Sequence, residues 1–462
     1  MAGAVLRSRS GAAIGEAQLA PFREAFAGEL IAAGDAAYET ARRIWNAMID
    51  KRPGLIARCT GVADIVAAIR FARANDVLVS VRGGGHNVGG RALNNDGLVI
   101  DLSRLKGVHV DAGHRTVRAQ GGATLGDVDR ETHAYGLTVP FGVVSRTGIA
   151  GLTLGGGVGW LVRKYGLTCD NVLAFDVVTA DARLLTASAE ENADLYWALK
   201  GGGGNFGVVT SFLYKAYPIA TVLGGPVFYP RAAAASVLRQ YRDFMAKAPE
   251  ELTAYAALVS LPDGTPATAI IACHCGEPAQ AERDLQPLRQ LAEPILDAIQ
   301  RIPMPAMQSL LDGAFPDGTH NYWKSTFVTE LSDAAIATIV EHAARATSPL
   351  TGMVVELYSG AASRIAPDAT AFAQRHAQYD VGIMAQWTNA AESDSHVAWA
   401  RDAAKAMQPF SSGGYLPNFL LEEPDELIRA AYGVNYARLQ QVKKAYDPTN
   451  FFSVNLNVKP AA

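Results

Sequence analysis

The sequence predicts an α+β protein in which a glycine-rich N-terminal part is followed by a second domain, a sheet covered by helices. Strand-like and helix-like segments alternate through the N-terminal part, as their hydrophobic periodicity indicates. After about residue 215 the glycine clusters end, and alanine-rich helices alternate with strand candidates. A length of 462 residues also favours two or three domains over one.

The elements of the N-terminal part can be placed in order along the chain. Thr124 and Asp127 have the spacing of a capping box, and Gly136 is expected to end the helix that they begin. Asn192 and Gly201 are expected to begin and end a shorter helix. The predicted elements are a helix over 63–75, strands over 77–81 and 97–105, a helix over 124–136, two strands around a tight turn over 175–185, and a helix over 192–202.

The second domain has a different composition, with long alanine-rich segments between short apolar ones. The alanine-rich segments predict helices and the apolar ones predict strands of a sheet. The expected elements are helices over 231–248 and 278–292 and strands over 254–261, 267–273, 352–360 and 382–389. The last stretch, residues 446–460, returns to a composition typical of turns and strands.

Composition narrows the classes of partner. The formal net charge is −4 and no run of like charges occurs, which argues against a nucleic acid or an anionic membrane surface as partner. No stretch of about 20 apolar residues predicts a transmembrane helix, and the N-terminal residues lack the apolar core of a signal peptide. We therefore expect a cytoplasmic protein.

The four cysteines are not expected to form a disulfide framework or a metal site. Cys59 and Cys169 lie far apart in the sequence, and Cys273 and Cys275 flank His274. On a strand, Cys273 and Cys275 would share one face while His274 would lie on the other. No second cluster completes four ligands, so the sequence predicts no metal.

Four glycine-rich stretches dominate the N-terminal part. They cover residues 80–90, 148–161, 164–171 and 201–210. Glycine lets a backbone approach a ligand closely, and successive N–H groups in such turns bind anions. An elongated ligand with phosphates, such as a dinucleotide, fits this pattern. The P-loop motif and the Rossmann fingerprint are both absent, which argues against an NAD-dependent enzyme.

These stretches also carry a family resemblance. RGGGHNVGG, GIAGLTLGGGVG, KYGLTCDN, GGGGNFGVVT and the terminal YDPTNFF, together with HNYWKS (320–325) and GGYLPNF (413–419), resemble the FAD-linked oxidases of the berberine-bridge-enzyme type. These belong to the vanillyl-alcohol-oxidase superfamily. The resemblance implies a PCMH-type FAD-binding domain of two α/β subdomains over 1–215. It also implies a substrate domain over 216–414, with an antiparallel sheet over the flavin ring, and a C-terminal segment over 415–462 that returns to the FAD domain.

The resemblance assigns the cofactor, FAD, and its contacts. In this family the histidine of the RGGH-type motif bonds to the 8α-methyl carbon of the flavin, and His86 matches that histidine. The expected FAD-binding residues are Arg82, Gly83, Gly84, Gly85, His86, Asn87, Gly121, Ser145, Thr147, Gly148, Gly151, Gly155, Gly156, Gly157, Tyr165, Gly166, Asp170, Asn171, Gly203, Asn205, Gly207, Val208, Val209 and Asn455.

Two positions depart from the pattern of many relatives. Where those carry a second tether, a cysteine bonded to flavin C6, this chain has Val144. The chain thus resembles the single-tether branch to which 6-hydroxynicotine oxidases belong. Family members often have a small aliphatic residue where Thr147 stands here, beside the proposed path of oxygen. This departure leaves the electron acceptor open.

The resemblance implies an oxidase that moves a hydride from a C–H bond of an alcohol, sugar, amine or secondary metabolite to flavin N5, with O2 as acceptor. Tyr415 matches a family tyrosine often assigned as base, with Lys324 lowering its pKa and Tyr322 in the substrate pocket. Glu356 and Tyr358 are two residues apart on a strand and are expected to share a face.

Two alternatives to an oxidase stay open at this stage. One is a flavin-dependent dehydrogenase that uses another acceptor. The other is a flavin-binding protein without catalysis, against which Tyr322, Lys324 and Tyr415 argue. The sequence identifies neither the substrate nor the oligomeric state, because one fold of this kind serves many chemistries.

Overall fold

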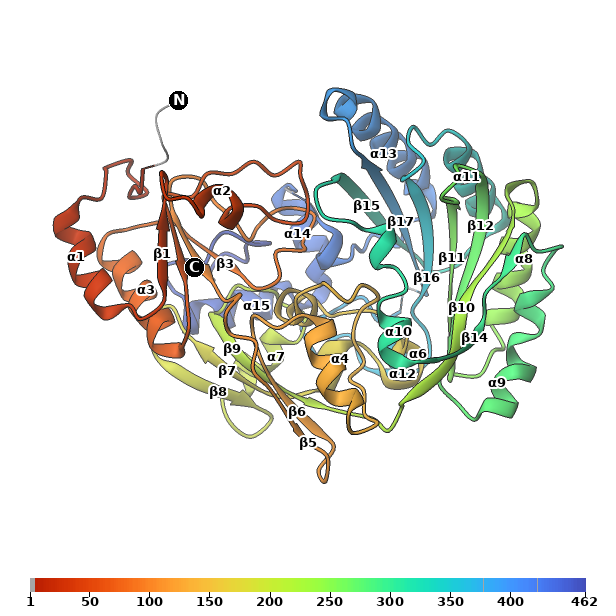
Figure 1. Ribbon diagram of the computed structural model, residues 1–462, viewed down its shortest axis with the longest axis horizontal. Coiled ribbons are helices and arrows are strands. Elements are labelled where there is room, and N and C mark those ends of the chain that lie inside the picture. The colour runs from red at the N-terminus through yellow and green to blue at the C-terminus, as the bar shows by residue number, and fades with distance from the viewer. Residues whose placement is uncertain (1–4, 377, 422) are drawn as a thin grey trace.

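The computed structural model describes residues 5–376, 378–421 and 423–462, which form three β-sheets with helices packed around them (Figure 1). The first sheet has four strands in the order β1-β2-β4-β3, parallel except for the β1–β2 pair. Its elements are α1 (Glu16–Ala25), β1 (Glu29–Ala32), α2 (Tyr38–Ala41), β2 (Leu55–Arg58), α3 (Val62–Ala74), β3 (Val79–Arg82) and β4 (Leu98–Asp101). As the sequence predicts, α3 buries Ile65 and Ile69 in the core beside this sheet.

The second sheet has five antiparallel strands in the order β5-β6-β9-β7-β8. Its elements are β5 (Val108–Asp111), β6 (Thr116–Gln120), α4 (Leu125–His133), α5 (Ile149–Leu154), α6 (Val162–Tyr165), η1 (Thr168–Asn171), β7 (Val172–Val178), β8 (Leu184–Ser188), α7 (Ala193–Leu199) and β9 (Val208–Lys215). The predicted capping box begins α4, since the Thr124 hydroxyl accepts from the Asp127 N–H and the Asp127 carboxylate accepts from the Thr124 N–H.

The third sheet is antiparallel, has eight strands, and follows the predicted boundary at residue 215. Its order is β13-β10-β12-β11-β16-β17-β15, and β14 pairs with β10. The strands are β10 (Thr221–Pro230), β11 (Leu252–Ser260), β12 (Pro266–His274), β13 (Leu296–Asp297), β14 (Gln300–Pro303), β15 (His320–Val328), β16 (Gly352–Leu357) and β17 (Tyr379–Trp387). The helices are α8 (Ala234–Met245), α9 (Pro278–Leu285), α10 (Met304–Gln308), α11 (Asp333–Ala344), α12 (Ala361–Arg364) and α13 (Ser393–Met407).

Helices cover one face of this third sheet, and the other face points at the N-terminal part (Figure 1). Alternate strand residues such as Val355, Val381 and Ile383 pack with Tyr241 of α8 and Ile336 of α11 in the covered core. Side chains alternate between the two faces of a strand. The residues between them, among them Val354 and Glu356 of β16, therefore face the N-terminal part.

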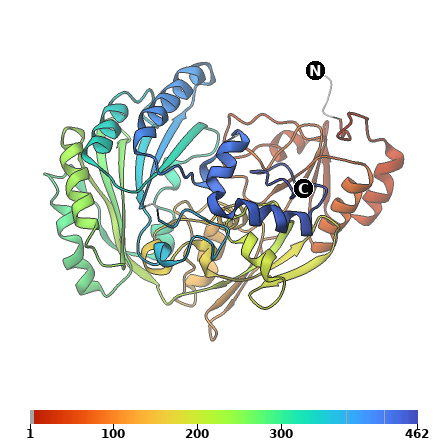
Figure 2. The same cartoon turned by 180° about the vertical axis from the view of Figure 1, so that it is seen from behind.

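The C-terminal segment leaves the third sheet and lies against the N-terminal part (Figure 2). Its helices are α14 (Asp425–Tyr432) and α15 (Tyr436–Tyr446), and their apolar side chains join the core of the second sheet. The buried Lys443 ammonium pairs with Asp447 at 2.6 Å and donates to the carbonyl of Asn205 at 2.7 Å. This contact fixes the chain end to the fourth glycine-rich stretch.

Short 3-10 helices connect the larger elements. They are η2 (Arg231–Ala233), η3 (Pro287–Arg289), η4 (Asp312–Ala314), η5 (Ala390–Glu392), η6 (Gln408–Phe410), η7 (Pro417–Phe419) and η8 (Gly433–Asn435).

The α+β class and most of the predicted elements are confirmed, with three differences. No strand forms over 446–460, because the Asp447 carboxylate and the Asn205 side chain accept N–H groups that a neighbouring strand would otherwise take. The helix expected over 278–292 ends at Leu285, where Pro287 follows. Asn192 stands at the start of α7 with φ 50°, and its side chain donates to the Thr186 carbonyl instead of capping. Several further strands and helices lie outside the predicted set, among them β10, β15, α11 and α13.

Candidate active site

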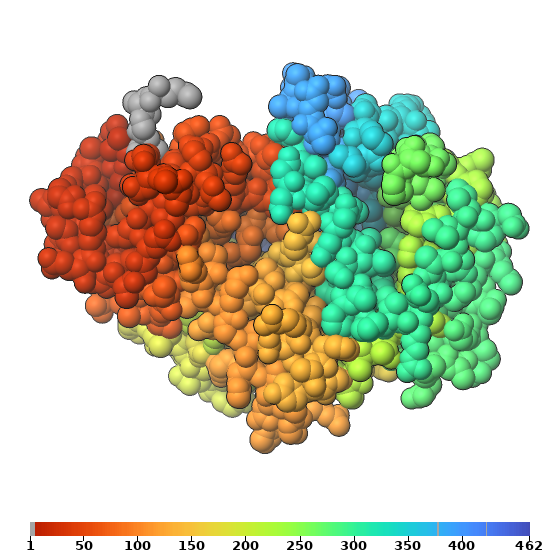
Figure 3. All heavy atoms as spheres, viewed as in Figure 1, coloured from red at the N-terminus to blue at the C-terminus, as the bar shows by residue number. Residues whose placement is uncertain are grey.

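A long cleft separates the glycine-rich loops from the uncovered face of the third sheet, where the N-terminal part and the later part of the chain meet (Figure 3). The space between its walls, including open solvent at its mouth, is about 2280 Å³. Its lining runs from the first glycine-rich stretch past the third sheet to the C-terminal segment. This elongated, mostly apolar lining with a few polar groups is typical of a small-molecule or cofactor site.

The predicted FAD residues divide into two groups. Fourteen of them line the cleft: Gly83, Gly84, Gly85, His86, Asn87, Thr147, Gly148, Gly151, Gly155, Gly203, Gly207, Val208, Val209 and Asn455. Ten lie outside the lining: Arg82, Gly121, Ser145, Gly156, Gly157, Tyr165, Gly166, Asp170, Asn171 and Asn205. The first, second and fourth glycine-rich stretches thus meet around one space, and the third stands behind it.

Close packing within the protein accounts for part of the glycine content. A Cβ on Gly84 would lie 2.4 Å from the backbone N of Gly148, and one on Gly148 would lie 2.3 Å from the backbone N of Gly84. Gly156, with φ 116°, leaves no room for a Cβ beside the ring of Phe372. The glycines therefore let distant loops touch each other as well as bringing backbone to the cleft.

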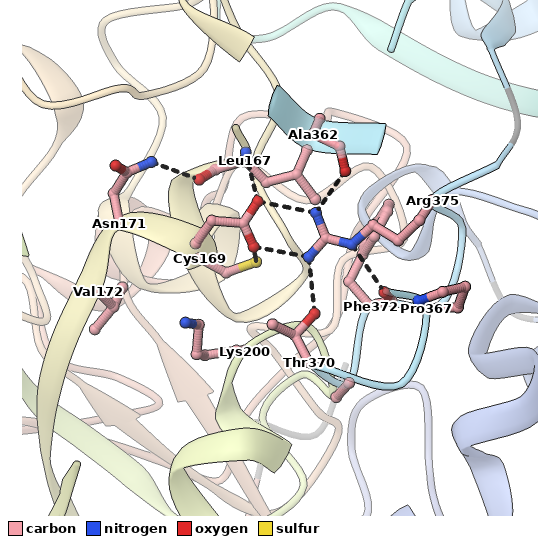
Figure 4. A network of polar contacts seen from close by, with 12 residues as sticks. Leu167, Cys169, Asn171, Val172, Lys200, Ala362, Pro367, Thr370, Phe372 and Arg375 are labelled. Atoms are coloured by element: carbon pink, nitrogen blue, oxygen red, sulfur yellow. Dashed lines mark hydrogen bonds and ion pairs between the residues drawn. The ribbon is translucent and has the colours of Figure 1, made fainter. Parts of the chain in front are cut away.

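Residues of the third glycine-rich stretch join the two parts of the chain. The Arg375 guanidinium forms a bidentate ion pair with Asp170 and also donates to Thr370 and to the carbonyls of Ala362 and Phe372 (Figure 4). The Asp170 carboxylate additionally accepts from the N–H of Leu167. Asp170 thus holds the segment after β16 in place and makes no contact with the cleft.

His86 stands at the cleft with its imidazole partly buried. Its ring stacks on Trp45, with centroids 4.5 Å apart and planes 12° apart. The Nε2 atom is fully buried and has no hydrogen-bond partner among the described residues. Burial lowers the pKa of His86 to about 4, so the ring is neutral at physiological pH. Since Nε2 is enclosed by protein, only the remaining part of the half-buried neutral ring can face a ligand in the cleft.

Other polar atoms around the cleft also lack partners within the described part of the chain. They belong to cleft-lining residues: Nε1 of Trp323, Oδ1 of Asn418 and Oδ1 of Asn455. Buried polar atoms are almost always hydrogen-bonded in a complete site. The residues present therefore fit a large polar ligand such as FAD.

The uncovered face of the third sheet supplies a buried acidic group. Glu356 of β16 lines the cleft with 6% of its surface exposed, and its Oε2 accepts a hydrogen bond from the Tyr358 hydroxyl at 2.7 Å. Burial raises the pKa of Glu356 to about 7. It is the only carboxyl group among the described residues that line the cleft. As their spacing predicts, Tyr358, one residue beyond the end of β16, lies on the same side as Glu356, but it stands behind the cleft lining.

Asp380 of β17 lies directly opposite Glu356 in the strand register. It is fully buried, and neither carboxyl oxygen makes a hydrogen bond of good geometry within the described structure, although the nearby Ser325 hydroxyl lowers its pKa to a small extent. Burial, with the neighbouring Glu356 charge, raises the pKa of Asp380 well above its ordinary value. Because an unpaired buried carboxylate is very unfavourable, Asp380 keeps its proton.

The remaining predicted catalytic residues lie outside the cleft lining. The ring of Tyr322 joins the helix-covered core of the sheet, and its hydroxyl accepts from Arg401 at 3.2 Å. Lys324 pairs with Glu423, and Tyr415 packs against the core of the second sheet. Their catalytic roles stay predictions, and the geometry favours Glu356 as the group that faces a substrate.

Several cleft residues were not predicted from the sequence. Tyr255, Trp323 and Met384 project into the cleft from strands. Trp45, which stacks on His86 outside the lining, comes from a segment without a motif. Period-two alternation along β11, β15 and β17 was the available signal. It does not say which of the two faces is uncovered, so these residues could not be separated from their core-facing neighbours.

Comparisons with known proteins identify the family. Two family models match the chain: the FAD binding domain over residues 53–188, and the berberine and berberine-like domain over residues 418–459. An FAD-linked oxidoreductase of Dictyostelium discoideum is 30% identical over 444 residues, which cover 95% of this chain and 96% of that protein. This chain belongs to the berberine-bridge-enzyme-like family of FAD-linked oxidoreductases.

Other relatives support the same placement. The (R)-6-hydroxynicotine oxidase of Paenarthrobacter nicotinovorans is 32% identical over 446 residues, which cover 94% of this chain and 97% of that protein. The crystal structure of 6-hydroxy-D-nicotine oxidase from Arthrobacter nicotinovorans has a TM-score of 0.88 at 29% identity and covers 94% of this chain and 98% of its own. A structure described as a glucose dehydrogenase shares the fold, with a TM-score of 0.84 at 22% identity over 97% of this chain and all of its own.

The berberine-bridge-enzyme-like chain is therefore an FAD-dependent oxidoreductase with a PCMH-type FAD-binding domain, as its motifs predict. The alternative of a flavin-binding protein without catalysis is not supported by these relatives. Within the described residues, no helix is both long and apolar enough to cross a membrane.

Proposed function

We propose that this enzyme is an oxidase that acts on a small molecule in the cytoplasm, with O2 as electron acceptor and with FAD tethered through His86. When bound, FAD supplies the two-electron oxidation of a substrate C–H bond. The observation that carries the proposal is Glu356, a buried carboxyl group that faces the cleft from the sheet. Its position suits removal of the O–H or N–H proton of a substrate lying between the sheet and the glycine-rich loops.

The surroundings of Glu356 support the role of a base. A raised pKa near 7 suits a group that must take a proton at physiological pH and release it afterwards. The Tyr358 hydroxyl fixes the carboxyl group by its hydrogen bond to Oε2. The apolar walls around Glu356 keep bulk water away, which strengthens its interaction with the substrate.

The tether rests on His86. Its neutral ring has a buried Nε2 without a hydrogen-bond partner and is held in orientation by the Trp45 stack. Val144 also lines the cleft, and it has no thiol for a second bond. We therefore propose a single covalent link through His86.

A dehydrogenase that uses another acceptor is the second candidate. Thr147 lines the cleft where family members often have a small aliphatic residue. A hydroxyl at this position makes the path proposed for oxygen more polar. The low formal net charge of −4 gives no support for a nucleic acid or a membrane surface as partner in either case.

The test starts with a substrate screen under air with peroxide detection. Flavin reduction by the identified substrate is then followed without oxygen in the Glu356→Gln and Tyr415→Phe variants. If Glu356 is the base, Glu356→Gln slows reduction on the order of 10²- to 10⁴-fold, whereas a loss confined to Tyr415→Phe would assign the base to Tyr415.

The acceptor is tested separately. The reduced enzyme is mixed with air-saturated buffer and, in a second sample, with a quinone in the absence of oxygen. Fast reoxidation in air supports the oxidase. Reoxidation that takes many minutes in air but is fast with the quinone would instead identify a dehydrogenase.

A further inference from the structure

We infer that Glu356 is the counter-ion for a substrate that carries one basic nitrogen on a compact apolar body. This inference rests on the proposed placement of the substrate between the third sheet and the glycine-rich loops. It concerns binding alone and requires no assumption about the electron acceptor.

The first argument is the isolation of the charge. Glu356 forms no ion pair with any Lys, Arg or His of the described residues, and its one hydrogen bond comes from the neutral Tyr358 hydroxyl. Asp380 beside it stays neutral, because burial raises its pKa well above the ordinary value. When Glu356 ionises, one negative charge faces the cleft without a cation to balance it, and a cationic ligand supplies that balance.

The second argument is the apolar character of the walls around this charge. Ala257, Ile271 and Val354 face the cleft beside Glu356, with Trp323 and Met384 further along the sheet. The Tyr255 hydroxyl already donates to the Gly159 carbonyl at 2.8 Å. A sugar needs several hydrogen-bond partners, and besides Glu356 these five residues and Tyr255 offer one unpaired donor, Nε1 of Trp323. A hydrophobic amine needs only apolar contact and one carboxylate, and the Trp323 ring adds a face that attracts cations.

The third argument is the pH range in which the site becomes charged. With a pKa of about 7, Glu356 is mostly protonated at pH 6 and mostly ionised at pH 8. The titratable groups on its own side of the sheet are the phenols of Tyr255 and Tyr358, whose pKa values burial raises, and Asp380, while the buried phenol of Tyr241 interacts with it from the covered side. An amine that stays protonated across this range should therefore bind more tightly as the pH rises.

The test uses two isosteric pairs of probes: benzylamine with benzyl alcohol, and 2-phenylpropan-2-amine with 2-phenylpropan-2-ol. The second pair has no C–H bond next to its heteroatom, so it cannot be oxidised there and reports binding alone. Calorimetric titration of the flavin-loaded enzyme gives the Kd without oxygen. At pH 8 each amine should bind at least about tenfold more tightly than its alcohol, the size expected for a close charge pair.

Two further readouts distinguish recognition by Glu356 from mere hydrophobic binding. The affinity for the amines should rise about tenfold from pH 6 to pH 8, and binding at pH 6 should release about 0.9 proton per ligand. Titration in buffers of different ionisation enthalpy measures that release. Glu356→Gln should abolish both effects. Asp380→Asn, the matched change of carboxyl to amide on the next strand, should keep them.

The outcomes separate this inference from the proposed function. Equal affinity for amine and alcohol, tighter binding of D-glucose, or no binding of either amine would overturn the inference even if the enzyme proved to be an oxidase. Preferential amine binding in an enzyme that air does not reoxidise would uphold it while the oxidase proposal fails. If Glu356→Gln does not fold, the pH dependence of amine affinity and the proton release on amine binding, both measured on the unmodified enzyme, still test the inference.

Discussion

Asp170 and Arg375 form a buried bidentate ion pair across the two parts of the molecule. The Nη2–Oδ1 distance is 2.7 Å and the Nη1–Oδ2 distance is 2.9 Å, with 1% of the Arg375 side chain and 6% of the Asp170 side chain exposed. Because Arg375 also donates to Thr370 and to backbone carbonyls, its charge is fully solvated by the protein. The pair fixes the segment that brings Phe372 against Gly156.

Arg375→Ala should therefore lower the free energy of unfolding by about 3–5 kcal/mol, since it leaves the Asp170 carboxylate buried without a cation. Arg364→Ala is the matched control. It removes an exposed bidentate pair with Glu250 in the same segment and should change the free energy of unfolding far less, because solvent screens exposed ion pairs. Urea unfolding of the flavin-loaded protein measures both, and equal effects of the two changes would contradict the role assigned to Arg375.

Gly148→Ala should reduce both stability and flavin content, because its methyl group would press on the backbone of Gly84. Overpacking of this kind typically costs about 1–3 kcal/mol, and the two loops form the cleft wall. Gly151→Ala is the control for the fold, since an added Cβ there meets nothing within 4 Å. Absorbance of the purified proteins gives the flavin-to-protein ratio. Full flavin content and unchanged stability in Gly148→Ala would show that the loops can separate without loss.

His86→Ala should keep FAD in the folded protein but release it on denaturation. Acid-precipitated unmodified protein should retain flavin in the pellet. The fluorescence of this flavin should be visible at low pH, because a thioether at flavin C6 would quench it and Val144 offers no thiol to form one. His396 is the matched control, because it is buried and stacks on Trp387 at 4.8 Å but lies away from the cleft. His396→Ala should leave the flavin in the pellet. Release of all flavin from the unmodified protein would disprove the tether.

The sequence predicts the presence of the cofactor site better than the roles of single residues. Glycine marks a backbone that must come close to something, but Gly84 and Gly148 come close to each other, and Gly156 makes room for Phe372. Only the folded chain distinguishes a ligand from another loop as the neighbour. The motif histidine was located correctly at the cleft, since its place is fixed by the strand and turn before it.

The residues that face the cleft from the third sheet were harder to predict, because the motif does not show which face of a strand is uncovered. On β15 the resemblance pointed to Tyr322 and Lys324, yet Trp323 lines the cleft and Tyr322 joins the covered core. Adjacent residues on a strand face opposite sides, so a shift by one position exchanges them. Glu356 and Tyr358 were placed together correctly because spacing by two does not depend on which face is covered.

Glu356 should also make stability depend on pH, with a sign that can be worked out. Its pKa is about 7 in the folded protein and 4.5 in the unfolded chain, so between these values the folded state binds more protons. Its contribution to stability is therefore fully present below about pH 4.5 and is lost as the pH rises through 7, for a total of about 3 kcal/mol. Glu356→Gln should remove this loss. Relative to the unmodified protein, the variant should gain about 3 kcal/mol in free energy of unfolding between pH 4.5 and pH 8, as measured by urea titration across that range.

Tyr358→Phe should have the opposite effect, because the hydrogen bond from Tyr358 lowers the pKa of Glu356. Without that bond the pKa of Glu356 rises further, and the loss of stability extends to higher pH. A constant stability difference between Glu356→Gln and the unmodified protein at all pH values would show that the carboxyl group is not desolvated in the folded enzyme.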